Sequence, residues 1–138
     1  MEQISNNNLL HKDITDVIIK CFYNVYNTLG FGFLEKVYNN AMFYEILETN
    51  HQCEKQKPIK VFYKKTVVGD YFADLVVNNK VIVELKACES ICEPHELQLI
   101  NYLRATDIEV GLLLNFGKKP EFKRKIFTND RKNIGADQ

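Results

Sequence analysis

The sequence predicts an α/β (α+β) fold in which helices flank a mixed sheet. Two stretches with apolar residues at intervals of three and four come first, and three strand-like stretches follow them. A further helical stretch then leads to a strongly apolar strand, and this order favours parallel pairing with the strand before that helix. We therefore expect an antiparallel three-stranded meander plus one parallel strand.

The first helix is expected over residues 12–29, because apolar residues recur there every three or four positions. Gly30 offers a stop for this helix. Together with Gly32 it permits a sharp turn into a second helix at 34–49. The apolar face of the first helix is most simply part of the core.

Strands are expected at 52–64, 70–77 and 81–87, where β-branched and aromatic residues are frequent. Pro58 within the first of them favours an edge strand or a bulge, because proline cannot donate a ladder hydrogen bond. A fourth strand is expected at 108–115, whose nearly continuous apolar run is typical of a buried parallel strand.

Residues 78–80 separate the second and third strands, and the length of this loop decides which face the acidic residues share. A two-residue loop leaves Asp74 on the face opposite Glu84, whereas a three-residue loop places the two acids directly across from each other. We expect the three-residue loop, with Asn79 or Lys80 in the left-handed conformation.

Glu84 and Lys86 are two residues apart in a strand and therefore project from the same face. With Asp74 opposite, two carboxylates and a lysine share a face with apolar residues, namely Phe72, Val76 and Ile82. Carboxylates placed in this way repel each other and lose hydration, and a hard divalent cation relieves both effects. The alternative is a surface ion pair between Lys86 and Glu84, with Asp74 solvated. Residue spacing alone leaves both open.

Asp74, followed after nine residues by Glu-Leu-Lys at 84–86, resembles the core of the PD-(D/E)XK nucleases, with Ala73 where that family usually has proline. Residues 32–38 match the GxxExxY signature of a small branch of that superfamily. Residues 98–102 match the QxxxY helix of its exonuclease-like members. The resemblance covers the chain from about residue 11 to 116, in the same order.

This resemblance implies a restriction-endonuclease-like core and a metal-dependent nuclease that hydrolyses phosphodiester bonds, with DNA favoured over RNA. It implies that Asp74, Glu84 and the Leu85 carbonyl hold Mg²⁺, for which Mn²⁺ can substitute. Glu35 is then an acid that joins the metal site directly or through water. The resemblance also implies that Lys86 is the catalytic lysine. It further implies that Gly32 allows close approach and that Tyr38 packs or hydrogen-bonds behind the site.

A helix is expected over 94–104, on which His95, Gln98 and Tyr102 share one face. Ordinary solvation of a polar helix face explains these residues without any function. The resemblance instead implies that Gln98 is catalytic and orients the metal-bound network or a phosphate. It implies that Tyr102, and with it His95, contacts the substrate.

Basic residues are concentrated in residues 118–132. Lys123 and Arg124 in this segment are candidates to bind a phosphate backbone. A solvated terminal segment with apolar residues tucked beneath it explains the pattern equally well.

The length of 138 residues agrees with one domain spanning 1–138, with flexible ends at 1–10 and 128–138. Eighteen basic and eighteen acidic residues cancel, so net charge gives no argument for nucleic acid. No apolar run approaches a membrane span, and the first residues lack the pattern of an export signal. We therefore expect a cytoplasmic protein with no membrane partner.

Other functions on the same fold stay open. One is a catalytically inactive module that binds nucleic acid or a protein partner. Another is a phosphoesterase that acts on small molecules. A homodimer also stays open, because a domain of this size covers little duplex alone.

Overall fold

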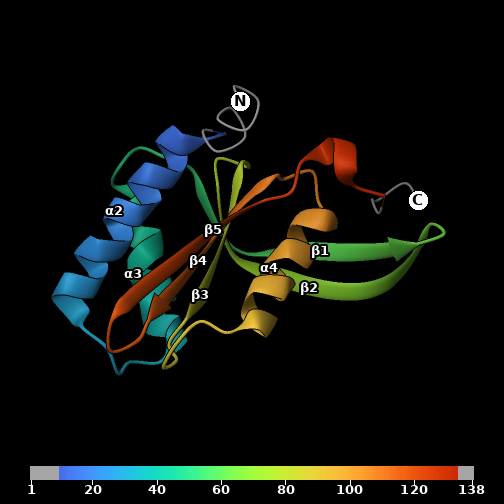
Figure 1. The fold of residues 1–138 in the computed structure, drawn as a ribbon. Coiled ribbons are helices and arrows are strands. Elements are labelled where there is room, and N and C mark those ends of the chain that lie inside the picture. Colours follow the sequence, from blue (N-terminus) through green and yellow to red (C-terminus); the bar gives the residue numbers. More distant parts are fainter. Residues whose placement is uncertain (1–9, 134–138) are drawn as a thin grey trace, which may run out of the picture.

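A mixed sheet with helices on both faces makes up the structure, a computed structural model that describes residues 10–133 (Figure 1). The chain forms, in order, α2 (Lys12–Leu29), α3 (Glu35–Leu47), β1 (Cys53–Tyr63), β2 (Thr66–Val77), β3 (Val81–Lys86), α4 (Glu93–Arg104), β4 (Val110–Phe116), β5 (Pro120–Ile126) and the 3₁₀ helix η1 (Asn129–Arg131).

The five strands lie side by side in chain order, from β1 to β5. β3 and β4 are parallel and are connected through α4, while the other neighbours are antiparallel. The predicted meander and parallel strand are therefore confirmed. Gly30 ends α2 as expected, with a φ of 69° and an N–H that donates to the Tyr26 carbonyl.

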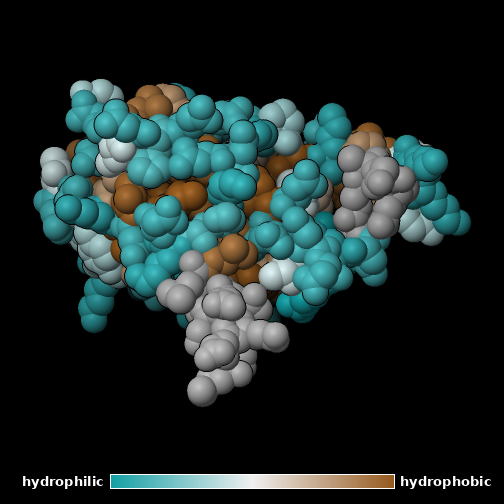
Figure 2. Space-filling view, turned by 90° about the horizontal axis from the view of Figure 1, so that it is seen from above, coloured by the Kyte–Doolittle hydropathy of each residue, from teal (hydrophilic) through white to brown (hydrophobic). Residues whose placement is uncertain are grey.

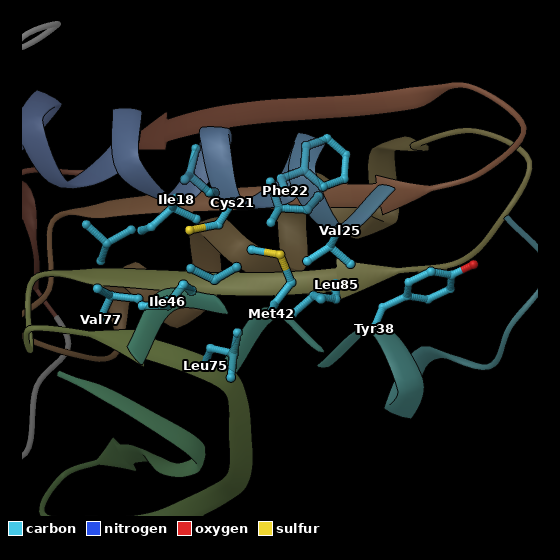
Figure 3. Close-up of a cluster of buried hydrophobic side chains, with 14 of the residues drawn as sticks. Ile18, Cys21, Phe22, Val25, Tyr38, Met42, Ile46, Leu75, Val77 and Leu85 are labelled. Carbon is cyan, nitrogen blue, oxygen red and sulfur yellow. The ribbon is translucent and has the colours of Figure 1, made fainter. Parts of the chain in front are cut away.

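Buried side chains form two layers, one on each face of the sheet. The larger layer packs α2 and α3 against the sheet through residues such as Phe22 and Met42 (Figure 3). The second layer packs α4 against the opposite face through Leu99 and Leu103. The sheet is thus enclosed between two helices on one side and one helix on the other.

The turn between β2 and β3 has the predicted register. Val77 pairs with Val81, so the loop has three residues. Both Asn78 and Asn79 have a φ of 53°, whereas Lys80 does not have positive φ. Asparagine tolerates this left-handed conformation better than most residues, which explains why two of them occur here.

β5 was not expected from the sequence. Residues 118–132 are interpreted above as a basic segment, but the structure has a strand here that pairs antiparallel with β4. Three consecutive basic residues, 123–125, hide the alternation that usually identifies a strand. Charged residues on an edge strand discourage pairing with another chain. The expected four-stranded sheet is therefore extended by a fifth strand.

β1 and β2 continue beyond the rest of the sheet as a two-stranded ribbon, which projects past α4 in Figure 1. The second strand begins at Thr66 and not at 70 as expected. β1 is an edge strand, in agreement with Pro58. The ribbon turns at Lys64 and Lys65, which have φ values of 51° and 67°. This conformation is unfavourable for residues other than glycine and asparagine.

The expected flexible ends are only partly described, because 1–9 and 134–138 lie outside the described residues. Within the described part, the Lys132 ammonium donates to the carbonyls of Thr106 and Ile108 at 2.9 and 2.7 Å. These bonds attach the segment after η1 to the connection before β4.

No helix within residues 10–133 has the length and apolar character needed to cross a membrane. The face of the molecule seen from above is mostly hydrophilic, and hydrophobic residues show through gaps between the polar ones (Figure 2).

Candidate active site

β2 and β3 separate where the two predicted acids lie. Their backbone pairing ends at Leu75 and Val83. One residue further, the backbone N–H of Asp74 donates to Glu84 Oε2 at 2.8 Å. The backbone N–H of Leu85 donates to Asp74 Oδ2 at 2.9 Å. Each carboxylate thus replaces a backbone acceptor, and each keeps a second oxygen that these two bonds do not use.

Burial makes the charged form of both acids unfavourable. Glu84 is only 5% exposed, and burial followed by repulsion from Asp74 raises its pKa from 4.5 to about 8. Burial also raises the pKa of Asp74, and the charge of Glu35 adds to this effect. The Leu85 N–H and the Lys86 ammonium act in the opposite direction on Asp74. A proton or another positive charge at the pair therefore relieves the repulsion between the two carboxylates.

The surface ion pair offered as the alternative is wrong. Glu84 is buried, and among residues 10–133 Lys86 belongs to no ion pair. Lys86 is half-buried at the end of β3, where its charge lowers the pKa of both acids. It therefore remains available to another negatively charged group near the carboxylates.

Glu35 is the first residue of α3 and lies near the acids without joining them in one tight group. It lines a cavity of about 250 Å³ together with Asp74 and Leu85. Its charge raises the pKa of both Asp74 and Glu84. In the described part of the chain, no three His, Cys, Asp or Glu residues are placed to hold a metal ion together. The structure thus brings together Asp74 and Glu84, and it places Glu35 in the cavity that Asp74 also lines.

Tyr38 fixes the loop that precedes α3. Its ring is fully buried and stacks on Phe116, with centroids 4.2 Å apart. Its hydroxyl donates to the Gly30 carbonyl at 2.7 Å and accepts from the Phe33 N–H at 3.2 Å. Figure 3 shows this hydroxyl pointing out of the core cluster. Tyr38 thereby fixes the start of the helix that carries Glu35.

Close packing against another part of the described chain does not explain Gly32. A Cβ at this position would meet no atom within 4 Å. Gly32 instead has a φ of 112°, which side chains other than glycine rarely accept. The glycine therefore serves the conformation of the loop.

Gln98 and Tyr102 line a groove of about 530 Å³ between α4 and the β1–β2 ribbon. The interpretation of Tyr102 as part of a solvated polar face is wrong, because only 6% of it is exposed. Burial, then the charges of Glu84 and Asp74, raise its pKa to about 12. The Tyr102 hydroxyl thus stays protonated and lies near the two acids.

His95 has a structural contact that the sequence did not indicate. Its Nδ1 accepts a hydrogen bond from the Cys92 N–H at 3.4 Å, and the Cys92 side chain caps α4 in return. The ring is therefore engaged at the start of its own helix, and it does not line the groove that contains Gln98.

A family model of the PD-(D/E)XK nuclease superfamily matches residues 12–125. This chain belongs to the PD-(D/E)XK nuclease superfamily. The fold is accordingly restriction-endonuclease-like, with the two acids where β2 and β3 separate. Searches of curated proteins and of solved structures each found no match. Membership of the GxxExxY branch stays a prediction.

In this PD-(D/E)XK chain, Lys123 and Arg124 point to opposite faces of the sheet, because neighbouring residues alternate along β5. The Arg124 guanidinium donates to the Leu10 carbonyl, in the segment before α2. Burial lowers the pKa of Arg124. Arg124 thus contacts the backbone of this chain at Leu10, while Lys123 is exposed.

The residue opposite Asp74 on β1, Gln56, was missed. It has a φ of 53° and is omitted from the pairing between the two strands. Its side chain lies close to Asp74 and lowers the pKa of that acid. Past this irregularity β2 exchanges its faces, because Val76 and Ala73 both pack under α4. No sequence signal marks this exchange.

The face exchange explains a further error in the predicted site. Phe72 was expected on the same face as the two acids, but it is 51% exposed. Its neighbour Tyr71 instead lies beside Tyr102, with ring centroids 5.7 Å apart.

Asn115 was also missed, although a lone polar residue at the end of an apolar strand is a usable signal. It is fully buried on β4 beside Lys86. Its amide accepts from the Cys88 N–H at 3.0 Å and donates to the Cys88 carbonyl at 2.9 Å. Asn115 thus fixes the chain just after the Glu-Leu-Lys motif.

Proposed function

We propose that this protein is a nuclease that hydrolyses phosphodiester bonds of DNA with Mg²⁺, for which Mn²⁺ can substitute. The observation that supports this most is the pair of carboxylates where β2 and β3 separate, Glu84 buried and Asp74 half-buried, with Lys86 two residues beyond Glu84. Superfamily membership supports a nucleic acid substrate. We also infer a single nuclease domain over 1–138 that belongs to the GxxExxY branch.

The donor atoms suit a hard divalent cation. Asp74 and Glu84 would supply carboxylate oxygens and Leu85 its carbonyl, and Mg²⁺ and Mn²⁺ both favour oxygen ligands. Two acids whose pKa values are raised by burial gain stability from added positive charge. When bound, the metal ion lowers the pKa of an attacking water and offsets charge on the phosphate.

The remaining residues act around this pair. Lys86 would hold the attacking water or stabilise negative charge that develops on the phosphate, since no ion pair engages it within residues 10–133. Gln98 would orient the phosphate or its hydration from the α4 side. The protonated Tyr102 hydroxyl would donate to the substrate. Glu35 would act through water, from the cavity that it shares with Asp74.

Metal binding tests the proposed ligands directly. Calorimetric titration with Mg²⁺ and Mn²⁺ should give binding to the native protein and loss of binding in Asp74→Asn and Glu84→Gln. These substitutions keep an oxygen that can accept the N–H bonds to the two carboxylates, so the fold is preserved. Asp70→Asn is the matched control, because Asp70 is exposed on the same strand.

Cleavage tests the activity. Linear double-stranded and single-stranded DNA should be cut by the native protein with either metal, and Lys86→Met should remove the cutting. Lys80→Met, an exposed lysine of the same hairpin, should leave it intact. DNA binding without cleavage would instead establish an inactive binding module. Turnover of small phosphate esters alone would establish a phosphoesterase.

A further inference from the structure

The groove between α4 and the β1–β2 ribbon has features beyond those that phosphodiester hydrolysis requires. Its volume of about 530 Å³ lies within the range of about 300–1,000 Å³ typical of small-ligand sites. Figure 1 shows α4 crossing β1 and β2 where the ribbon leaves the sheet. Among the described residues, no acidic side chain lines this groove. The groove therefore suits a ligand other than a cation.

Two tyrosines connect the groove to the carboxylates. Tyr71 is 47% exposed, and its ring centroid lies 5.7 Å from that of Tyr102. Tyr102 is buried and lies near Glu84 and Asp74. An aromatic surface thus leads from solvent to the proposed site of cleavage. Stacking on such a ring is favourable for every nucleobase, because each base has a flat π face.

Polar groups of a suitable kind surround this aromatic surface. Gln98 and Asn101 present carboxamides, each of which can both donate and accept a hydrogen bond. The Arg104 guanidinium donates to Asn101 Oδ1 at 3.2 Å and so orients that amide. Amide and guanidinium groups are those that pair with base edges. A nucleobase that stacks on Tyr71 would have these amide and guanidinium groups near its edge.

We propose that this groove binds one unpaired nucleobase of the substrate strand, stacked on Tyr71, next to the phosphate that is cleaved. The assignment rests on the proposed nuclease function and specifies its substrate as nucleic acid with single-stranded character. A base in the groove has left its duplex stack, and a fully paired strand must first lose stacking and pairing energy to place it there.

Equilibrium binding of a fluorescently labelled oligo(dT) strand tests this without any cleavage, first in EDTA and then in Ca²⁺. Since stacking on an aromatic ring is worth about 1–3 kcal/mol per base, Tyr71→Ala should weaken binding by roughly 5- to 150-fold. Tyr71→Phe should bind within about twofold of the native protein, because the ring is kept. Phe72→Ala is the matched control, since Phe72 is the half-exposed neighbour on the other face.

An abasic scan locates the base. Removing one base at a single position should weaken binding by the native protein about as much as Tyr71→Ala does. The same removal should have little further effect in Tyr71→Ala, because the two changes delete the same contact. A blunt duplex of equal length should bind more weakly than the single strand. Equal binding by native and Tyr71→Ala proteins, or equal losses for Tyr71→Ala and Phe72→Ala, would overturn the proposal.

The outcome is independent of that for the nuclease. If strand binding depends on Tyr71 but the protein cuts no DNA with Mg²⁺ or Mn²⁺, the base site is supported and the nuclease function is refuted. If the native protein cleaves DNA but Tyr71→Ala binds the strand as tightly as the native protein does, the nuclease function stands and the base site is refuted.

Discussion

Replacing Glu84 with glutamine should stabilise the metal-free protein at neutral and alkaline pH. Burial and Asp74 raise the pKa of Glu84 from 4.5 to about 8, so between these values the folded state holds a proton that the unfolded state has lost. Stability therefore falls as pH rises through this window. At about 1.4 kcal/mol per pKa unit, the loss approaches roughly 5 kcal/mol above pH 8 and about 3 kcal/mol at pH 7. Glutamine has no such proton to lose.

Thermal unfolding followed by circular dichroism in EDTA, from pH 5 to 8.5, measures this effect. For a domain of this size, 1 kcal/mol corresponds to roughly 3 °C in Tm, so Glu84→Gln should gain on the order of 10 °C over the native protein near pH 8 and little at pH 5. Glu48→Gln, an exposed position just after α3, is the control. A difference between Glu84→Gln and native protein that stays constant across the range would refute the reasoning.

Three further outcomes follow from the same structure. Millimolar Mg²⁺ should raise the Tm of the native protein more at pH 8 than at pH 5, since protons compete for the same carboxylates, and an equal rise at both would contradict the site. Changing Lys64 to Asn and Lys65 to Gly should raise the free energy of unfolding in urea by about 1–2 kcal/mol, because both positions have positive φ. An unchanged urea midpoint would argue against backbone strain at these two lysines. Tyr38→Phe should lower that free energy by about 1–2 kcal/mol, since the Gly30 carbonyl and Phe33 N–H lose their partner, whereas the exposed control Tyr44→Phe should not.

The register of the acidic hairpin was predictable because it depends on counting. Side chains alternate with a period of two, so an odd loop length places Asp74 across from Glu84, and the observed pairing of Val77 with Val81 has that length. The separation of the strands after that point was not predictable. It depends on carboxylates replacing backbone acceptors, and that exchange leaves no pattern in the residue types.

Errors at the site trace to features of a similar kind. The alternation of side chains along β2 predicted Phe72 on the face of the two acids. At the left-handed Gln56 the side chains of β2 change faces, so Tyr71 lies toward α4 instead. β5 was missed because its middle residues are charged. In each case the local backbone or an edge position overrides the pattern of side chains.

The two carboxylates have structural and functional roles that cannot be separated by simple deletion. Asp74 accepts the Leu85 N–H, and Glu84 accepts the Asp74 N–H, so alanine at either position removes a proposed oxygen ligand and also leaves a backbone donor unpaired. An unpaired buried donor costs about 1–3 kcal/mol. The same N–H groups lower the pKa of the two acids and so favour their charged forms, whereas burial raises the pKa. The strand separation thus brings two acids together at the proposed cation site, and only substitutions that keep the acceptor oxygen separate the loss of the proposed ligand from the loss of fold.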